Sequence, residues 1–245
     1  MTETPTGLPA SIEAAWGLRE RPQKGPRPGL TLPRVVAAGV AVARAEGIDA
    51  VSMSRVAKEL GAATMSLYRY ISAKHELIEL MVDSVYGDPP SIEPGEGWRA
   101  GISRWVWAIV DVYQRDPWIV QVPISGPPIT PNSVAWGDNA LRRLAGTGLG
   151  PAERLSVLLL VSNLVRGEMT LALQLAEVYR GPNAANMIDY GARLSRLIDE
   201  RRFPAMSELV ASGIFDGSDS EYDDLRFALD RVLDGIDVLI RSRAS

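Results

Sequence analysis

The stretch VSMSRVAKELGAATMSLYRYISAK, residues 51–74, decides the fold of the N-terminal part of the chain. Ser52 is a candidate N-cap for one short helix, and Gly61 permits the tight turn that ends it. A second short helix is expected from about residue 63 to residue 70. Apolar residues at helical spacing would hold the two helices together, namely Val56, Ala57, Leu60 and Leu67. Two short helices joined by a glycine turn predict a helix-turn-helix, which places its second helix in the major groove of DNA.

The outward side of the second helix carries small polar, aromatic and basic residues. They are Thr64, Ser66, Tyr68, Arg69 and Tyr70. Such groups can bond to phosphates and base edges, and Lys74 in the first turn of the next helix can add a phosphate contact. The alternative is a surface helical hairpin in which Tyr68 and Tyr70 are partly buried.

Helical patterns continue on both sides of this motif. Thr31 is a candidate N-cap for a helix that ends at Gly47, and Ser72 is a candidate cap for a helix that reaches Val85. Further helices are expected over 98–116, 131–145, 151–180, 183–200, 204–212 and 222–243. Strand alternation is absent, so we predict an all-α protein.

Charge is distributed unevenly along the chain. The net charge of the 245 residues is −4, yet ten Lys and Arg face only four acidic residues between Arg19 and His75. A basic N-terminal part on an acidic body is typical of a DNA-binding head. The Pro- and Gly-rich residues 1–29 are expected to form a flexible basic arm. Its stretch from Arg19 to Arg27 could follow phosphates or the minor groove, or it could be a disordered tail.

Composition excludes several kinds of catalytic and metal site. The chain has no cysteine and one histidine, His75, so thiolate zinc sites, cysteine nucleophiles and two-histidine metal sites are excluded. Gly146-Thr-Gly-Leu-Gly150 lacks the lysine of a phosphate-binding loop and is expected to be a turn. We therefore expect no catalytic residue, metal or cofactor. The absence of cysteine fits a cytoplasmic protein, and no membrane span is predicted.

The segment Leu30–Tyr86 resembles the N-terminal domain of TetR-family (tetracycline-repressor-like) transcriptional regulators. The matching motifs are Glu46-Gly47-Ile48, Ser52-Met53-Ser54-Arg55-Val56-Ala57, Leu60-Gly61, Leu67-Tyr68-Arg69-Tyr70 and Lys74-His75-Glu76-Leu77. Ala62-Ala63 departs from the family pattern at the cap of the second helix, where Thr64 is expected to substitute, and Ile71 stands in place of phenylalanine.

The resemblance implies roles for individual residues of the motif. It implies that Thr64, Met65, Ser66, Arg69 and Tyr70 face the groove, while Tyr68 and Lys74 hold phosphates. Contacts to DNA are also expected around the start of the first helix, from Ser52, Ser54 and Arg55.

The same resemblance implies that residues 87–245 form a helical domain that binds a small effector and dimerises through its last helices. An apolar stripe on the final helix suits such a subunit interface: Leu225, Leu229, Val232, Leu233, Ile236 and Ile240. The alternative is that this stripe packs within its own subunit.

A polar stripe crosses the largely apolar helix 151–180. Asn163, Arg166, Thr170, Gln174 and Glu177 fall on one side of it, so they could line a ligand cavity, cross the dimer seam or face solvent. Aromatic walls of an effector site are expected from Trp105, Trp107, Tyr113, Trp118 and Trp136, although for each tryptophan taken alone the core is the favoured alternative.

These observations predict an arm (1–29), a three-helix DNA-binding domain (30–86) and a larger helical effector-binding and dimerisation domain (87–245). The expected function is a homodimeric, sequence-specific transcriptional regulator, a repressor that a small organic effector releases from a palindromic duplex operator. The alternative is a helical ligand-binding or adaptor protein that does not bind DNA.

Overall fold

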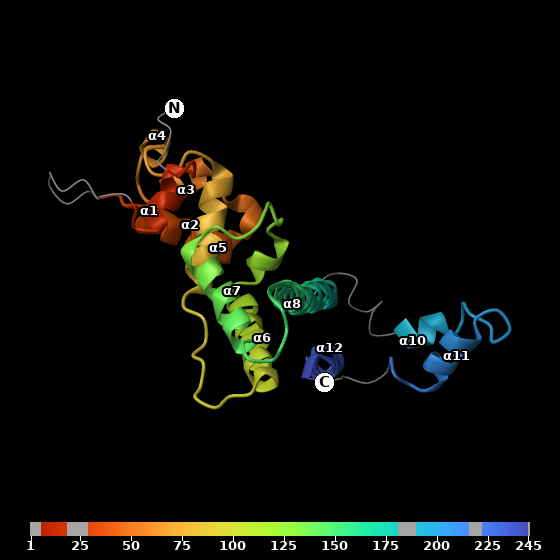
Figure 1. The fold of residues 1–245 in the computed structure, drawn as a ribbon. Helices are drawn as coiled ribbons and strands as arrows, with labels where there is room; N and C mark the ends of the chain where they lie inside the picture. The colour runs from red at the N-terminus through yellow and green to blue at the C-terminus, as the bar shows by residue number, and fades with distance from the viewer. Residues whose placement is uncertain (1–5, 19–28, 181–189, 216–221, 245) are drawn as a thin grey trace.

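The computed structural model describes residues 6–18, 29–180, 190–215 and 222–244, and within these ranges every regular element is a helix (Figure 1). In chain order the elements are α1 (Ala10–Ala15), α2 (Leu32–Glu46), the 3-10 helix η1 (Ile48–Ala50), α3 (Met53–Glu59), α4 (Thr64–Leu67), α5 (Lys74–Tyr86), α6 (Trp98–Arg115), the 3-10 helix η2 (Pro117–Gln121), α7 (Pro131–Arg143), α8 (Pro151–Arg180), α10 (Tyr190–Leu194), α11 (Pro204–Ala211) and α12 (Asp223–Ala244). The all-α prediction is confirmed.

Helices α2 to α5 form a small N-terminal head. The hydroxyl of Thr31 accepts a hydrogen bond from the backbone N–H of Arg34 at 3.3 Å, so Thr31 caps α2 as predicted. Helices α2 and α5 pack closely at Gly39, where an added Cβ would lie 2.6 Å from the sulfur of Met81. Only glycine fits this crossing without a shift of Met81.

The first described segment departs from the prediction of a flexible basic arm over residues 1–29. Residues 10–15 form α1, whose Ile12 is completely buried. The Ser11 hydroxyl donates to the carboxylate of Glu76 in α5 at 2.6 Å, and the Trp16 indole donates to the carbonyl of Ile129 at 2.8 Å. The prediction is wrong here because one apolar side chain and these long-range bonds order the helix. The whole basic stretch from Arg19 to Arg27 lies outside the described residues.

The body is built on α6, α7, α8 and α12, and α8 is a single helix of 30 residues as predicted. Helix α12 lies beside α8 (Figure 1). The predicted helix 183–200 falls partly outside the described residues, and its described part is helical only over Tyr190–Leu194. Helices α10 and α11 contact each other and project away from the rest of the body (Figure 1).

The stripe on α12 corrects a prediction. Leu225, Leu229, Leu233 and Ile236 are at most 4% exposed within the single chain. Val232 and Ile240 are half-buried against the same core. The stripe therefore packs on its own subunit, because α12 covers α8, and most of it is not available to a second copy.

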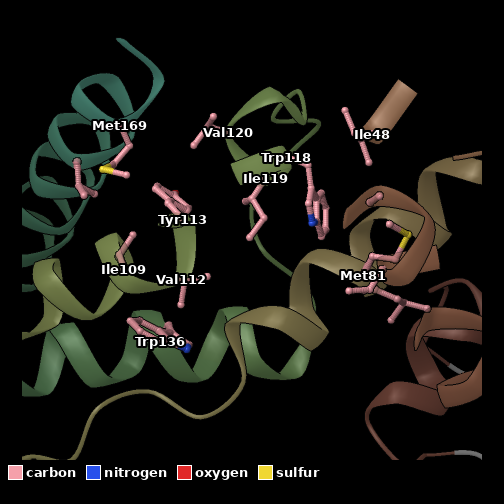
Figure 2. Close-up of a cluster of buried hydrophobic side chains, with 14 of the residues drawn as sticks. Ile48, Met81, Ile109, Val112, Tyr113, Trp118, Ile119, Val120, Trp136 and Met169 are labelled. Carbon is pink, nitrogen blue, oxygen red and sulfur yellow. The ribbon is translucent and has the colours of Figure 1, made fainter. Parts of the chain in front are cut away.

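Head and body share one apolar core around η2. Figure 2 shows Trp118 and Ile119 of η2 between the head residue Ile48 and Tyr113 of α6. Trp118 is 4% exposed and Ile119 is 1% exposed. The short helix η2 is therefore one of the elements through which the body meets the head, together with α6 and α7, which contact α5.

Candidate nucleic-acid interface and its link to the body

Helices α3 and α4 form the predicted helix-turn-helix. The Ser52 hydroxyl accepts a hydrogen bond from the N–H of Arg55 at 3.1 Å, which confirms it as the cap of α3. Gly61 has a φ of 62°, and the chain turns there so that the N–H of Ala62 donates to the carbonyl of Ala57 at 2.9 Å. Val56 and Leu67 are completely buried between the two helices. The motif thus has a fixed internal geometry.

The outer side of α4 presents the side chains expected to meet DNA. Met65 is 75% exposed and Tyr68 is 45% exposed. Arg69 and Lys74 are also exposed, while Thr64 and Ser66 at the start of α4 are half-buried. These residues give one face of the head a mixture of cations, hydroxyl groups and one thioether.

Other predicted contacts have partners inside the head. The Arg55 guanidinium bonds to Glu46 at 2.6 Å and to Glu59 at 2.9 Å, and these carboxylates raise its pKa. The Tyr70 hydroxyl donates to the carbonyl of Leu30 at 2.8 Å, which ties the end of the motif to the start of α2. Both groups are thus engaged within the fold, in contrast to the expectation that they face DNA. Ser52 is engaged as a cap, whereas Ser54 is exposed on α3.

Two predicted helix caps are wrong. Ala63 rather than Thr64 is the N-cap of α4, and Ala73 rather than Ser72 is the N-cap of α5. Neither makes a side-chain cap bond. Instead the buried carboxylate of Glu76 accepts from the N–H of Ser72 at 3.2 Å and from Ser11 of α1. This carboxylate lies in the first turn of α5, where the helix dipole favours negative charge.

A bidentate ion pair joins the head to the body. Arg44 of α2 donates to both carboxylate oxygens of Asp116 at 2.7 and 2.8 Å, and the Trp118 indole donates to the same carboxylate at 3.0 Å. Burial alone raises the pKa of Asp116, but these hydrogen bonds outweigh it and hold the pKa below its ordinary value. Asp116 directly precedes η2, so this ion pair ties the start of η2 to α2.

Asp116→Asn should lower the free energy of unfolding by about 1–2 kcal/mol at pH 7, because charge-assisted hydrogen bonds to a buried carboxylate are lost. A depressed pKa contributes stability that is present above the unfolded value and lost as pH falls through the folded one. The difference between wild type and variant should therefore shrink below about pH 4. Urea unfolding at pH 7 and pH 3 measures it, with exposed Asp138→Asn as the control. An equal difference at both pH values would contradict this account of the pair.

The predicted aromatic walls divide between separate places: Trp105, Trp136 and Tyr113 lie together around Tyr86, whereas Trp107 and Trp118 lie elsewhere. Trp105 donates to the carbonyl of Trp136 at 3.0 Å, and Trp136 donates to the carbonyl of Gly87 at 2.9 Å. Trp118 lies at the junction with the head, while Trp107 packs edge-on against Tyr222 beside α12. Trp105, Trp118 and Trp136 are at most 4% exposed and belong to the core.

The residues of the polar stripe on α8 also have different surroundings: some bond within the chain and others are exposed. Arg166 donates through Nη2 to the carbonyls of Val120 at 3.0 Å and Val122 at 2.6 Å, and the Thr170 hydroxyl donates to the carbonyl of Arg166 at 2.7 Å. Asn163, Gln174 and Glu177 are exposed. Arg166 therefore holds the far end of η2, the segment whose near end is tied to the head by Asp116.

One apolar feature of α8 escaped the sequence analysis. The outer side of this helix exposes large apolar side chains on both sides of the polar residues Asn163 and Gln174, namely Leu155, Leu159, Leu160, Leu171, Leu175 and Val178. Steps of four residues, such as Leu155 to Leu159, were a visible signal for a second apolar face. The stretch Pro151–Val178 even has the length and hydropathy of a membrane span, and little of it is buried in the chain. A groove of about 510 Å³ between α8 and α12 continues this face.

Beside the half-buried Arg166, the hydroxyl groups of Tyr86 and Tyr113 lie 3.0 Å apart. Burial raises the pKa of Tyr86 well above its ordinary value, while the nearby charge of Arg166 acts in the opposite direction. Tyr86 ends α5, the last helix of the head, and Tyr113 lies on α6. Polar groups from the head and the body thus converge close to η2.

A helix-turn-helix with an exposed basic face, carried on a larger helical body, defines a DNA-binding regulator. Residues 35–81 match the model of bacterial regulatory proteins of the tetR family, and residues 90–240 match the tetracyclin repressor-like C-terminal domain. The chain therefore belongs to the TetR family of transcriptional regulators.

Individual relatives agree with this assignment. The chain is 35% identical over 240 residues to the HTH-type transcriptional repressor DrrR1 of Streptomyces coeruleorubidus, covering 95% of this chain and 87% of that protein. The apo structure of ActR from Streptomyces coelicolor shares the fold with a TM-score of 0.74 at 22% identity, over 89% of this chain and 99% of ActR. ActR in complex with actinorhodin gives 0.71 at 24% identity, over 84% and 96% of the two chains.

Proposed function

We propose that this protein is a homodimeric repressor that binds a palindromic duplex operator in the cytoplasm and leaves it when a small organic effector binds the body. The observation that carries the proposal is the continuous connection from α8 through η2 to the helix-turn-helix head. Residues 30–86 would form the DNA-binding unit and residues 87–245 the body. The similarity to the transcriptional repressor DrrR1 supports repression rather than activation of transcription.

Dimerisation is assigned to the outer face of α8 and the adjoining side of α12. The exposed leucines of α8, together with Phe227 and Val238 of α12, form an apolar surface that the single chain leaves uncovered. Two-fold pairing of this surface would bury it, since the same patch meets itself in an isologous dimer. Asn163 lies on this outer face of α8, so its place is the subunit seam and not an effector site.

The effector is proposed to act on Arg166. An anionic or carbonyl oxygen of an effector could accept the hydrogen bonds that the Arg166 guanidinium now donates to the carbonyls of Val120 and Val122. An acceptor is required because arginine donates and cannot accept. The hydroxyl groups of Tyr86 and Tyr113 would offer further polar contacts. Freed from α8, η2 would shift and carry Asp116 and Arg44 with it. ActR shows that this fold accommodates a ligand, since its solved complexes contain actinorhodin or (S)-DNPA.

An effector that acts through η2 can change operator affinity only as far as it binds one head position more tightly than the other. This difference in binding free energy is typically about 1–3 kcal/mol. In a dimer, the two recognition helices must lie about 34–36 Å apart to enter successive major grooves. A small rotation of each head is therefore sufficient to weaken binding.

Arg166→Met tests the effector proposal. Aromatic acids and phenols are first screened for release of an operator from the wild-type protein by fluorescence anisotropy. The variant should bind an identified effector about ten- to a hundredfold more weakly, because a charged hydrogen bond is lost. Its operator affinity should fall even without effector, since η2 is no longer held. Arg196→Met, which removes an exposed arginine outside the head and outside the proposed seam, is the matched control. A variant with full operator affinity and a normal effector response would place the site elsewhere.

A further inference from the structure

Met65 is an apolar group in an unexpected place. It is the most exposed large apolar side chain between residues 29 and 91, at 75%. Its neighbours in α4 and the following turn are Thr64, Ser66, Tyr68 and Arg69, all able to form hydrogen bonds. A flexible thioether therefore stands among polar groups on the outer side of the recognition helix.

The geometry of α4 fixes the direction of this side chain. Leu67 follows two residues later and is completely buried. Two residues correspond to roughly 200° of rotation in an α-helix, so Met65 lies opposite the side that packs on the head. The side of the helix away from the head core is the side that a helix-turn-helix presents to the groove.

The major groove offers one apolar group among its base edges. Purines and cytosine present acceptors and donors there, whereas thymine presents an acceptor and its C5-methyl group. The thioether of methionine has no donor and is at best a weak acceptor, so it cannot replace a hydrogen bond to a base edge. Its favourable contact in the groove is with a methyl group. The C5-methyl group of 5-methylcytosine would offer the same chemistry.

We propose that Met65 is a specificity-determining residue that contacts the C5-methyl group of a thymine in each operator half-site. This inference rests on the proposed operator binding and adds the kind of base that the recognition helix selects. The polar neighbours Thr64, Ser66 and Arg69 would then bond to adjacent bases or phosphates.

The test replaces thymines one at a time by deoxyuridine, which pairs identically but lacks the methyl group. The duplex is the sequence that the wild-type protein enriches from a random pool. At one thymine position in each half-site, replacement by deoxyuridine should lower operator affinity about fourfold. Replacement in both half-sites should lower it about fifteenfold, as expected for burial of one methyl group per subunit. Binding is measured by fluorescence anisotropy at fixed salt.

Variants of Met65 connect the effect to this residue. Met65→Ala and Met65→Gln should bind the thymine and deoxyuridine duplexes equally, whereas Met65→Leu should keep the difference. Because Met65 is exposed, these variants should retain the wild-type circular dichroism and melting temperature. Leu197→Ala, which is 79% exposed in wild type and lies outside the head, is the matched control and should keep full sensitivity to deoxyuridine.

Each other outcome has a defined meaning. Equal binding of all deoxyuridine duplexes by the wild type would overturn the inference while leaving operator binding intact. Full deoxyuridine sensitivity in Met65→Gln would assign the methyl contact to another residue. Replacing the sensitive pair by C·G and then by 5-methyl-C·G separates the two methyl sources, and preference for 5-methylcytosine over thymine would contradict the thymine assignment. Failure of the wild type to bind any duplex would contradict operator binding itself, and Met65 with it.

Discussion

Leu159→Glu is expected to convert the protein into a folded monomer that no longer binds its operator. Leu159 is 54% exposed on the outer face of α8, so the charge is tolerated in the single chain. In the proposed dimer it would place two carboxylates in an apolar seam, at a cost of several kcal/mol. Operator binding should be lost with dimerisation, because one head alone reaches only one half-site.

Sedimentation velocity, circular dichroism and anisotropy on the same preparation measure this result. Ile124→Glu is the control, because Ile124 is 72% exposed in the loop after η2 and lies outside the proposed seam. Leu233→Glu provides a contrast: Leu233 is 1% exposed within the chain, so that variant should unfold rather than dissociate. A Leu159→Glu protein that remains dimeric would contradict the assignment of the dimer interface to this face of α8.

The second large effect is expected at the exposed face of the head. Changing Tyr68, Arg69 and Lys74 together to alanine should lower operator affinity at least about a hundredfold, since base contacts of about 1–3 kcal/mol and phosphate contacts are removed from both subunits. Lys74→Ala alone should weaken binding to all sequences equally. It should also lower the slope of log K against log salt by about one for each subunit.

A control variant removes Arg196 and Arg201, which are exposed outside the head. It should leave both operator affinity and the salt slope close to wild type. Undiminished operator binding by the folded triple variant would show that α4 is not the recognition helix.

Local signals predicted the head well. The caps Thr31 and Ser52, the turn at Gly61 and the buried positions Val56 and Leu67 all follow from rules that act within one or two helical turns. The predicted caps at Thr64 and Ser72 were wrong. At α5 the carboxylate of Glu76 accepts from the backbone N–H of Ser72, and α4 begins at Ala63 without a side-chain cap bond.

The body was predictable as helices but not as an assembly. Periodicity showed an apolar stripe on α12, yet it could not say whether α8 or a second copy covers it. The bonds of Arg166 to carbonyls 44 and 46 residues earlier, and of Arg44 to Asp116 72 residues later, have no local pattern. The tryptophans cluster in sequence, yet only Trp105 and Trp136 contact each other, whereas Trp118 lies at the junction with the head and Trp107 packs against Tyr222.

Selection from a pool of random duplexes tests the central claim most directly. The wild-type protein should enrich a two-fold symmetric sequence whose half-sites are centred one helical turn apart, about 34–36 Å. The triple variant at Tyr68, Arg69 and Lys74 should enrich nothing above the starting pool. A wild-type selection that yields no common sequence, or the same sequence from the triple variant, would contradict the assignment of α3 and α4 as the operator-binding motif.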